Sequence, residues 1–174
     1  GSLPDVGIAQ AQSETETTDV SEHIKSLYQK ASELYQQGSY AEAIPPAEEL
    51  LAVAIATLGE THIGIATFQS FLANLHYLQG NYTQALLLYK EALEIRELAL
   101  GADHIDVATN LNNLAQIYQV QGSYAEALPR YQRALEIFET ALRPNHPHVA
   151  TNLNNLAVLY QSQGNYAEAL PQYQ

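Results

Sequence analysis

The sequence predicts an all-α fold, a solenoid of antiparallel helix pairs that stack along one axis. One supporting observation is a repeat of constant period, because Gly38, Gly80, Gly122 and Gly164 each begin a Gly-Ser/Asn-Tyr triplet and follow one another at intervals of 42 residues. The other is an apolar pattern with helical spacing inside each copy. Four copies are present, the first divergent and the last incomplete. Units that recur in this way bury their apolar faces against their own neighbours.

Each copy contains two amphipathic helices joined by a tight turn. Leu111, Leu114, Ala115 and Tyr118 fall at positions i, i+3, i+4 and i+7, which is the apolar stripe of one helix. A second stripe runs from residue 124 to residue 138, after a glycine turn. Small residues recur at two places in the repeat and allow helix axes to approach closely. They are Ala31, Ala73, Ala115 and Ala157 in the first helices, and Ala43, Ala85, Ala127 and Ala169 in the second.

The turn residues predict where the second helices begin. Glycine supplies the left-handed conformation that ends the first helix, and the Ser or Asn after it is expected to cap the second helix. Glu42, Glu126 and Glu168 stand where they would complete capping boxes. Proline at Pro45-Pro46, Pro129 and Pro171 is expected to bend the second helices mildly without breaking them.

Histidine also recurs with the repeat, at His62, His104 and His146. Equivalent positions in adjacent repeats are separated by a whole helix pair, so these residues cannot share one metal ion. We expect each to make a cap or loop hydrogen bond at the start of a first helix. No metal site, no cofactor and no catalytic group is predicted, because no positioned base, nucleophile or Gly-rich phosphate loop occurs.

The repeat resembles a known family. The order of Leu114, Ala115, Tyr118, Gly122, Tyr124, Ala127, Tyr131 and Ala134 is similar to the tetratricopeptide consensus. The 42-residue form, with LNNLA, YAEALPRYQRALEIFE and PNHPHVAT, resembles the kinesin light chain subfamily and its bacterial relatives. The resemblance implies a right-handed α-solenoid, the TPR superhelix, whose concave face is lined by the first helix of each pair.

The sequence also predicts a domain organisation. Residues 1–18 are expected to be a disordered tail, with Gly1-Ser2 as a tag remnant, and we expect a fragment of a longer protein. The repeat domain is expected over residues 19–174, with repeats at about 21–59, 62–101, 104–143 and 146–174, the last truncated.

The charge of the chain bears on its partners. With 7 Lys and Arg against 19 Asp and Glu, the formal net charge is -12, which disfavours nucleic acid and anionic membranes. No apolar run approaches the ~18 residues of a membrane span. We therefore expect a cytoplasmic protein, with allowance for an upstream signal that has been removed.

The distribution of charge points to a binding groove. No Asp, Glu, Lys or Arg occurs at 62–79, 107–125 or 149–167, so the first helices predict an uncharged, Asn-rich concave face. In relatives that bind extended peptides, the residue before the conserved Leu is commonly an Asn that binds the ligand backbone, and Asn113 and Asn155 occupy that place. The expected peptide-binding residues are Thr67, Ser70, Phe71, Asn74, Thr109, Asn112, Asn113, Gln116, Thr151, Asn154 and Asn155.

These residues predict a non-enzymatic scaffold that binds an extended peptide segment of another protein. Two alternatives remain open for the site: the amides are solvated surface, or Phe68 and Phe71 pack against the preceding repeat and form no apolar pocket. Two others concern function. The repeats self-associate as a homodimer or stack through an uncapped C-terminal end, or they form the sensor arm of a larger protein.

Overall fold

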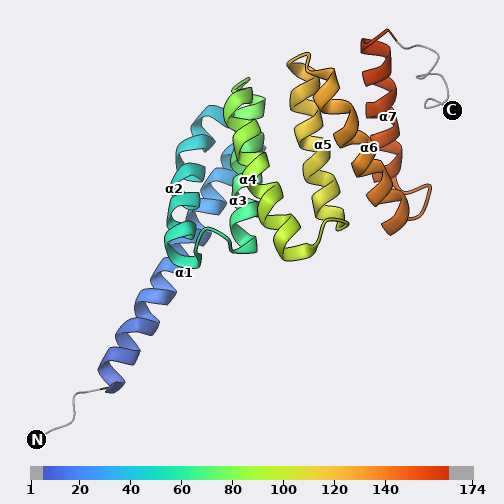
Figure 1. Ribbon diagram of the computed structural model, residues 1–174. Helices are drawn as coiled ribbons and strands as arrows, with labels where there is room; N and C mark the ends of the chain where they lie inside the picture. The colour runs from blue at the N-terminus through green and yellow to red at the C-terminus, as the bar shows by residue number, and fades with distance from the viewer. Residues whose placement is uncertain (1–5, 165–174) are drawn as a thin grey trace, which may run out of the picture.

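The described part of the computed structural model covers the backbone of residues 6–164 and the side chains of residues 16–164. It contains seven helices and no strand within those limits. Their bounds are α1 (Val6–Gln36), α2 (Tyr40–Leu58), α3 (Ile63–Leu78), α4 (Tyr82–Leu100), α5 (Ile105–Val120), α6 (Tyr124–Ala141) and α7 (Pro147–Ser162). Each helix packs chiefly on the one before it and the one after it, so the chain is a linear stack of hairpins (Figure 1).

The small residues of each repeat are fully covered in the core. Ala31, Ala73, Ala115 and Ala157 of the first helices are all buried, as are Ala43, Ala85 and Ala127 of the second helices. Larger side chains from neighbouring hairpins fill the space that these alanines leave, and Leu50, Leu114 and Tyr131 are completely enclosed. Ala169 and Pro171 lie outside the described residues.

The turn between the two helices of a hairpin is built as expected at its glycine and differently at its cap. Gly38 has φ 75°, a left-handed conformation, and its N–H bonds to Tyr35 O while the Ser39 N–H bonds to Leu34 O. The pair of bonds completes the end of α1. The predicted capping box is wrong, because Ser39 lies at φ -85°, ψ 60° and makes no side-chain cap bond.

The same turn recurs at the two later hairpins that the structure describes, with Asn81 and Ser123 in the place of Ser39, and neither makes a side-chain cap bond. An N-cap that accepts from its own helix needs an extended backbone. Here the backbone N–H is committed to the preceding helix, and this fixes a different conformation. Glu168 lies outside the described residues.

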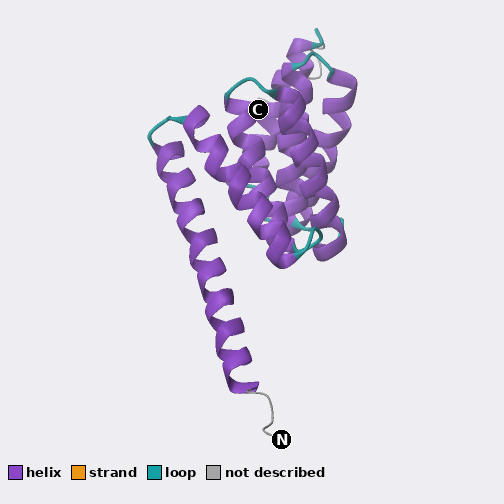
Figure 2. Ribbon diagram, turned by 90° about the vertical axis from the view of Figure 1, so that its left-hand side faces the viewer, coloured by secondary structure: helices purple, strands orange, loops and turns teal. Residues whose placement is uncertain are grey.

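Two further expectations concern helix continuity. Pro45, Pro46 and Pro129 lie inside α2 and α6 without interrupting either helix. Residues 6–18, expected to be disordered, form the start of α1, and this part of the helix extends away from the hairpins (Figure 2). This segment has no internal proline, and its Ala, Gln and Glu residues favour helix.

Candidate ligand-binding face

The first helices α1, α3, α5 and α7 form a row in which α1 touches α3 and α5 touches α7 through side chains, while Arg96 of α4 joins α3 to α5. The Tyr35 and Phe71 rings join α1 to α3, with centroids 6.0 Å apart. Asn152 Nδ2 on α7 donates to Asn112 Oδ1 on α5 at 2.6 Å. The sequence-predicted binding residues therefore lie along one row of helices.

On α3 these residues occupy the side opposite the core. Ile65, Leu72 and Ala73 are buried on one side of the helix, whereas Thr67 is exposed and Asn74 is half-buried on the other. We call this side the first-helix face, defined by Thr67, Ser70, Phe71, Asn74, Thr109, Asn112, Asn113, Gln116, Thr151, Asn154 and Asn155. It carries little charge, because α3 and α7 contain no Asp, Glu, Lys or Arg and α5 contains only Asp106, in its first turn.

Several of these polar groups already bond to neighbours. Ser70 Oγ accepts from Arg96 Nη1 at 2.8 Å, and Asn74 Nδ2 donates to the Tyr35 hydroxyl at 3.2 Å. Asn112 accepts from α7 as described above. The Thr109 hydroxyl donates to Ile105 O of its own helix. The bonds of Ser70, Asn74 and Asn112 join different helices. All four residues have fewer hydrogen-bonding groups left for a ligand.

Four amides of the face, at Asn113, Gln116, Asn154 and Asn155, make no hydrogen bond among the described residues. Asn113 and Gln116 on α5 are half-buried. Asn155, one repeat after Asn113, buries its Nδ2 atom without an acceptor in the described part of the chain. A buried N–H without an acceptor costs about 1–3 kcal/mol. Thr67, Thr151 and Asn154 are exposed.

Phe71 illustrates the difference between repeat two and the later repeats. Its ring lies 5.7 Å from Tyr28 and 6.0 Å from Tyr35, both on α1, and Phe68 lies 6.1 Å from Tyr28. The rings therefore pack against the preceding repeat, one of the two alternatives that the sequence left open. Tyr28 remains 44% exposed, so an aromatic surface still borders the first-helix face.

Arg96 on α4 is a contributor that the sequence reasoning missed. Its Nη1 atom donates to Ser70 Oγ at 2.8 Å and to Asn110 Oδ1 at 2.5 Å. Arg96 therefore bridges α3 and α5 from the second helix between them. Burial lowers the pKa of the Arg96 guanidinium and nearby Asp106 opposes the shift, but an arginine stays charged at neutral pH. The signal was available, because Arg96 stands where the repeats before and after carry Ala54 and Phe138.

The recurring histidines cap the first helices as expected. Nδ1 of His62, His104 and His146 accepts from the backbone N–H two residues later, at 3.0, 3.0 and 3.1 Å. The described residues contain no cluster of three or more acidic or histidine side chains arranged to hold a metal ion. Among them, no helix has the length and apolar character needed to cross a membrane.

A right-handed stack of helix hairpins with one nearly uncharged, amide-rich side defines a helical repeat scaffold. The chain belongs to the tetratricopeptide repeat family, which it matches over residues 23–98, 65–140 and 106–174. The tetratricopeptide fold is typical of protein–protein interaction scaffolds, and its members typically bind protein or peptide partners. No curated protein matches the chain with significance.

Solved structures give the same fold. BtubC (BKLC) from P. vanneervenii superposes with a TM-score of 0.76 at 23% identity, over 82% of this chain and 57% of that one. The kinesin light chain-like repeats of Podosopora anserina superpose with a TM-score of 0.77 at 26% identity, over 86% and 71%. The apo form of RapI superposes with a TM-score of 0.76 at 21% identity, over 87% and 53%. The tetratricopeptide repeat and the kinesin light chain-like repeats are non-catalytic scaffold folds.

Proposed function

We propose that the first-helix face binds an extended, uncharged peptide segment of a partner protein. The observation that carries the proposal is the set of unpaired amides at Asn113, Gln116 and Asn155. A primary amide both donates and accepts, so it satisfies a peptide N–H and C=O together. Asn113 and Gln116 are only half-buried, so a bound backbone could reach their amides.

The spacing of the repeat suits an extended ligand. An extended chain advances about 3.3 Å per residue, so a short strand can pass from one first helix to the next. Asn113 and Asn155 hold equivalent places in consecutive repeats, because they are one 42-residue period apart. They would therefore hold peptide groups several residues apart on one strand.

The charge pattern favours a neutral contacting segment. Acidic side chains are exposed on the second helices, for example Glu48 on α2, Glu94 on α4 and Glu136 on α6, and are almost absent from the first-helix face. Arg96 already directs Nη1 to Ser70 and Asn110. Binding should depend only weakly on ionic strength, because few charges are paired on association.

Selection from a random-peptide display library, followed by fluorescence anisotropy, tests the proposal. The replacements Asn113→Ala and Asn155→Ala should each weaken the selected peptides about 2- to 10-fold, the range expected for one net hydrogen bond. Gln84→Ala is the matched control, because Gln84 is an exposed amide at the start of α4. This control should bind as the unmodified protein does.

If the Asn113→Ala and Asn155→Ala variants bind the selected peptides as tightly as the unmodified protein does, the assignment of this face is refuted. A steep loss of affinity with added salt would refute the uncharged ligand. If no peptide is selected and sedimentation velocity shows reversible assembly with rising concentration, self-association replaces peptide binding as the function.

A further inference from the structure

A polar hollow lies on the side of the second helices, away from the first-helix face. It has a volume of about 430 Å³ and is bounded by the end of α2, the following turn, α3 and α4. Its acidic lining consists of Glu60, Glu91 and Glu94, and its apolar lining includes Ile95 and Leu98. Leu98 is 80% exposed.

A buried amide at this hollow lacks a partner. Gln69 is only 6% exposed and donates from Nε2 to Glu91 at 3.3 Å. Its Oε1 atom is buried and accepts no hydrogen bond from the described residues. The equivalent residues of the next two repeats are Leu111 and Leu153, so an ordinary core position has become a polar one here.

The three carboxylates are not paired with a cationic side chain. Among the described residues, Glu60, Glu91 and Glu94 form no ion pair. Negative groups that gather around a partly enclosed space without a counter-charge favour a cation from outside. A metal ion is not the cation that we expect here, because the described residues contain no group of three or more His, Cys, Asp or Glu side chains that could hold one.

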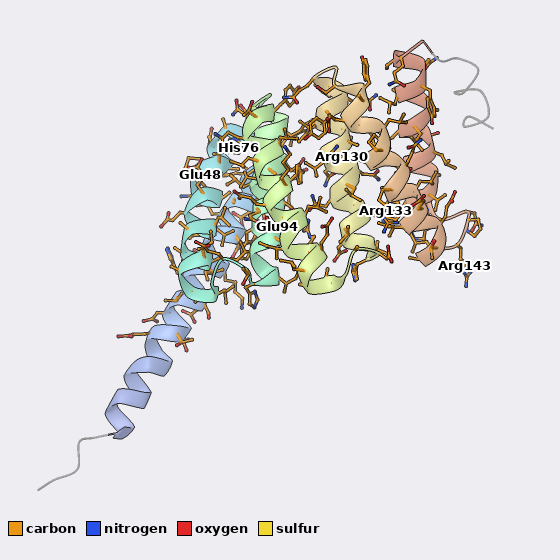
Figure 3. All side chains as sticks on the ribbon, in the orientation of Figure 1. Glu48, His76, Glu94, Arg130, Arg133 and Arg143 are labelled. Carbon is orange, nitrogen blue, oxygen red and sulfur yellow. The ribbon has the colours of Figure 1, made fainter. Side chains whose placement is uncertain are left out.

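The next repeat contains the same hollow with a cation built in. This second hollow, of about 360 Å³, is lined by Asp103, Arg133, Glu136 and Ile137 among others. Arg133 occupies the place of Glu91, and Glu136 that of Glu94. The Arg133 guanidinium bonds to both Asp103 and Glu136, and these bonds raise the pKa of Arg133. Figure 3 labels Glu94 on α4 and Arg133 one repeat further, on α6.

We propose that the hollow between α2, α3 and α4 binds a primary ammonium group on an unbranched alkyl chain. The ammonium has three N–H donors. The carboxylates of Glu91 and Glu94 and the Gln69 Oε1 atom accept these hydrogen bonds, and Ile95 and Leu98 contact the methylene groups. A lysine side chain of a protein partner and a free alkyl diamine share this chemistry. This site is separate from the first-helix face, so neither proposal depends on the other.

Nuclear magnetic resonance titration of the whole chain tests the proposal. The probes are N-acetyl-lysine N-methylamide and 1,5-diaminopentane, and the neutral control is N-acetyl-norleucine N-methylamide. We expect saturable shifts of the Gln69 side-chain amide and the Leu98 methyl signals with both ammonium probes and no such shifts with norleucine. Tighter binding of the lysine derivative would identify a protein side chain as the ligand, and tighter binding of the diamine a free polyamine. The absence of saturable shifts with both would overturn the proposal.

Three variants locate the site. Glu91→Arg reproduces the arrangement at Arg133 and should abolish binding while the helix content measured by circular dichroism stays the same. Gln69→Leu removes one acceptor of a charge-assisted hydrogen bond and should weaken binding about tenfold. Glu48→Arg makes the same charge change on α2, at an exposed residue outside the hollow lining, and should keep the affinity within about twofold because exposed charges are screened by salt. Equal loss in the Glu48→Arg and Glu91→Arg variants, or unchanged binding in Glu91→Arg, would overturn the assignment.

Discussion

The Arg96 guanidinium on α4 donates to the Asn110 amide oxygen on α5 at 2.5 Å, and the Asn110 Nδ2 atom donates to Tyr89 O at 2.8 Å. Asn110 is fully buried. The two bonds connect a second helix to the next first helix through polar groups. They therefore help to position the helix that carries Asn113 and Gln116.

Replacing Arg96 by methionine should destabilise the chain. The methionine side chain keeps much of the length of the arginine side chain but has no N–H donor. Asn110 Oδ1 would therefore stay buried without a hydrogen-bond partner. We expect a loss of about 1–3 kcal/mol in the free energy of unfolding, measured by urea denaturation. Arg143→Met, at an exposed arginine between α6 and α7, should change stability by less than about 0.5 kcal/mol. Similar losses in the two variants would contradict a role for the Arg96 bonds.

The histidine caps give a second prediction. His104→Ala removes the acceptor for the Asp106 N–H at the start of α5, and it should cost about 0.5–2 kcal/mol of unfolding free energy. His104→Asn should recover most of the loss, since asparagine is among the best N-cap residues. Thermal unfolding followed by circular dichroism measures both. If asparagine is no better than alanine, the capping bond contributes nothing.

Phe71 should behave as a structural residue. Phe71→Asn introduces the residue that the later repeats carry at this position, and it removes the ring contacts with Tyr28 and Tyr35. Because Phe71 is half-buried, we expect a loss of about 1–3 kcal/mol, below the cost of deleting a fully buried ring. Unchanged stability in denaturant together with a changed set of selected peptides would instead assign Phe71 to the ligand.

The buried phenol of Tyr131 predicts a loss of stability at alkaline pH. Burial raises the pKa of Tyr131 above its ordinary value, and the hydroxyl donates to Gln119 Oε1 at 2.9 Å. In the unfolded chain this phenol ionises near pH 10, so its contribution is fully present below about pH 10 and declines as the pH rises further.

Tyr131→Phe should therefore lose less stability than the unmodified chain between about pH 9 and pH 11, even if it is less stable by about 0.5–1.5 kcal/mol at pH 7. Urea unfolding at the two pH values makes the comparison. Tyr89 remains in both proteins, and burial raises its pKa too, so part of the alkaline loss should persist. An identical pH dependence in the two proteins would contradict the assignment to Tyr131.

Several expectations were correct because they rest on local chemistry. The left-handed glycines and the histidine caps depend on residues a few positions apart, and their bonds are found at Gly38, Gly80 and Gly122 and at His62, His104 and His146. The capping box failed for a related reason. Its sequence signature treats the start of a helix in isolation, whereas the Ser39 N–H is already used by α1.

The binding residues show where local reasoning stops. The pattern placed Asn112 and Asn113 side by side as equals, yet Asn112 bonds to α7 and Asn113 has no partner among the described residues. An amide accepts whichever neighbour lies within reach, and that neighbour is 40 residues away in sequence. The same limit hid the contact between Arg96 and Ser70.

The sequence by itself determined the family, the helical hairpin and the nearly charge-free first helices, because a fixed period and a 3.6-residue pattern leave few other ways to bury the apolar side chains. The tertiary structure decided which polar groups are consumed within the stack and which remain free. It also decided that Arg133 fills one hollow while Glu91 leaves the equivalent one acidic. Those outcomes depend on distances between helices, which hydrogen bonds and charges sense steeply and which no periodicity along the chain specifies.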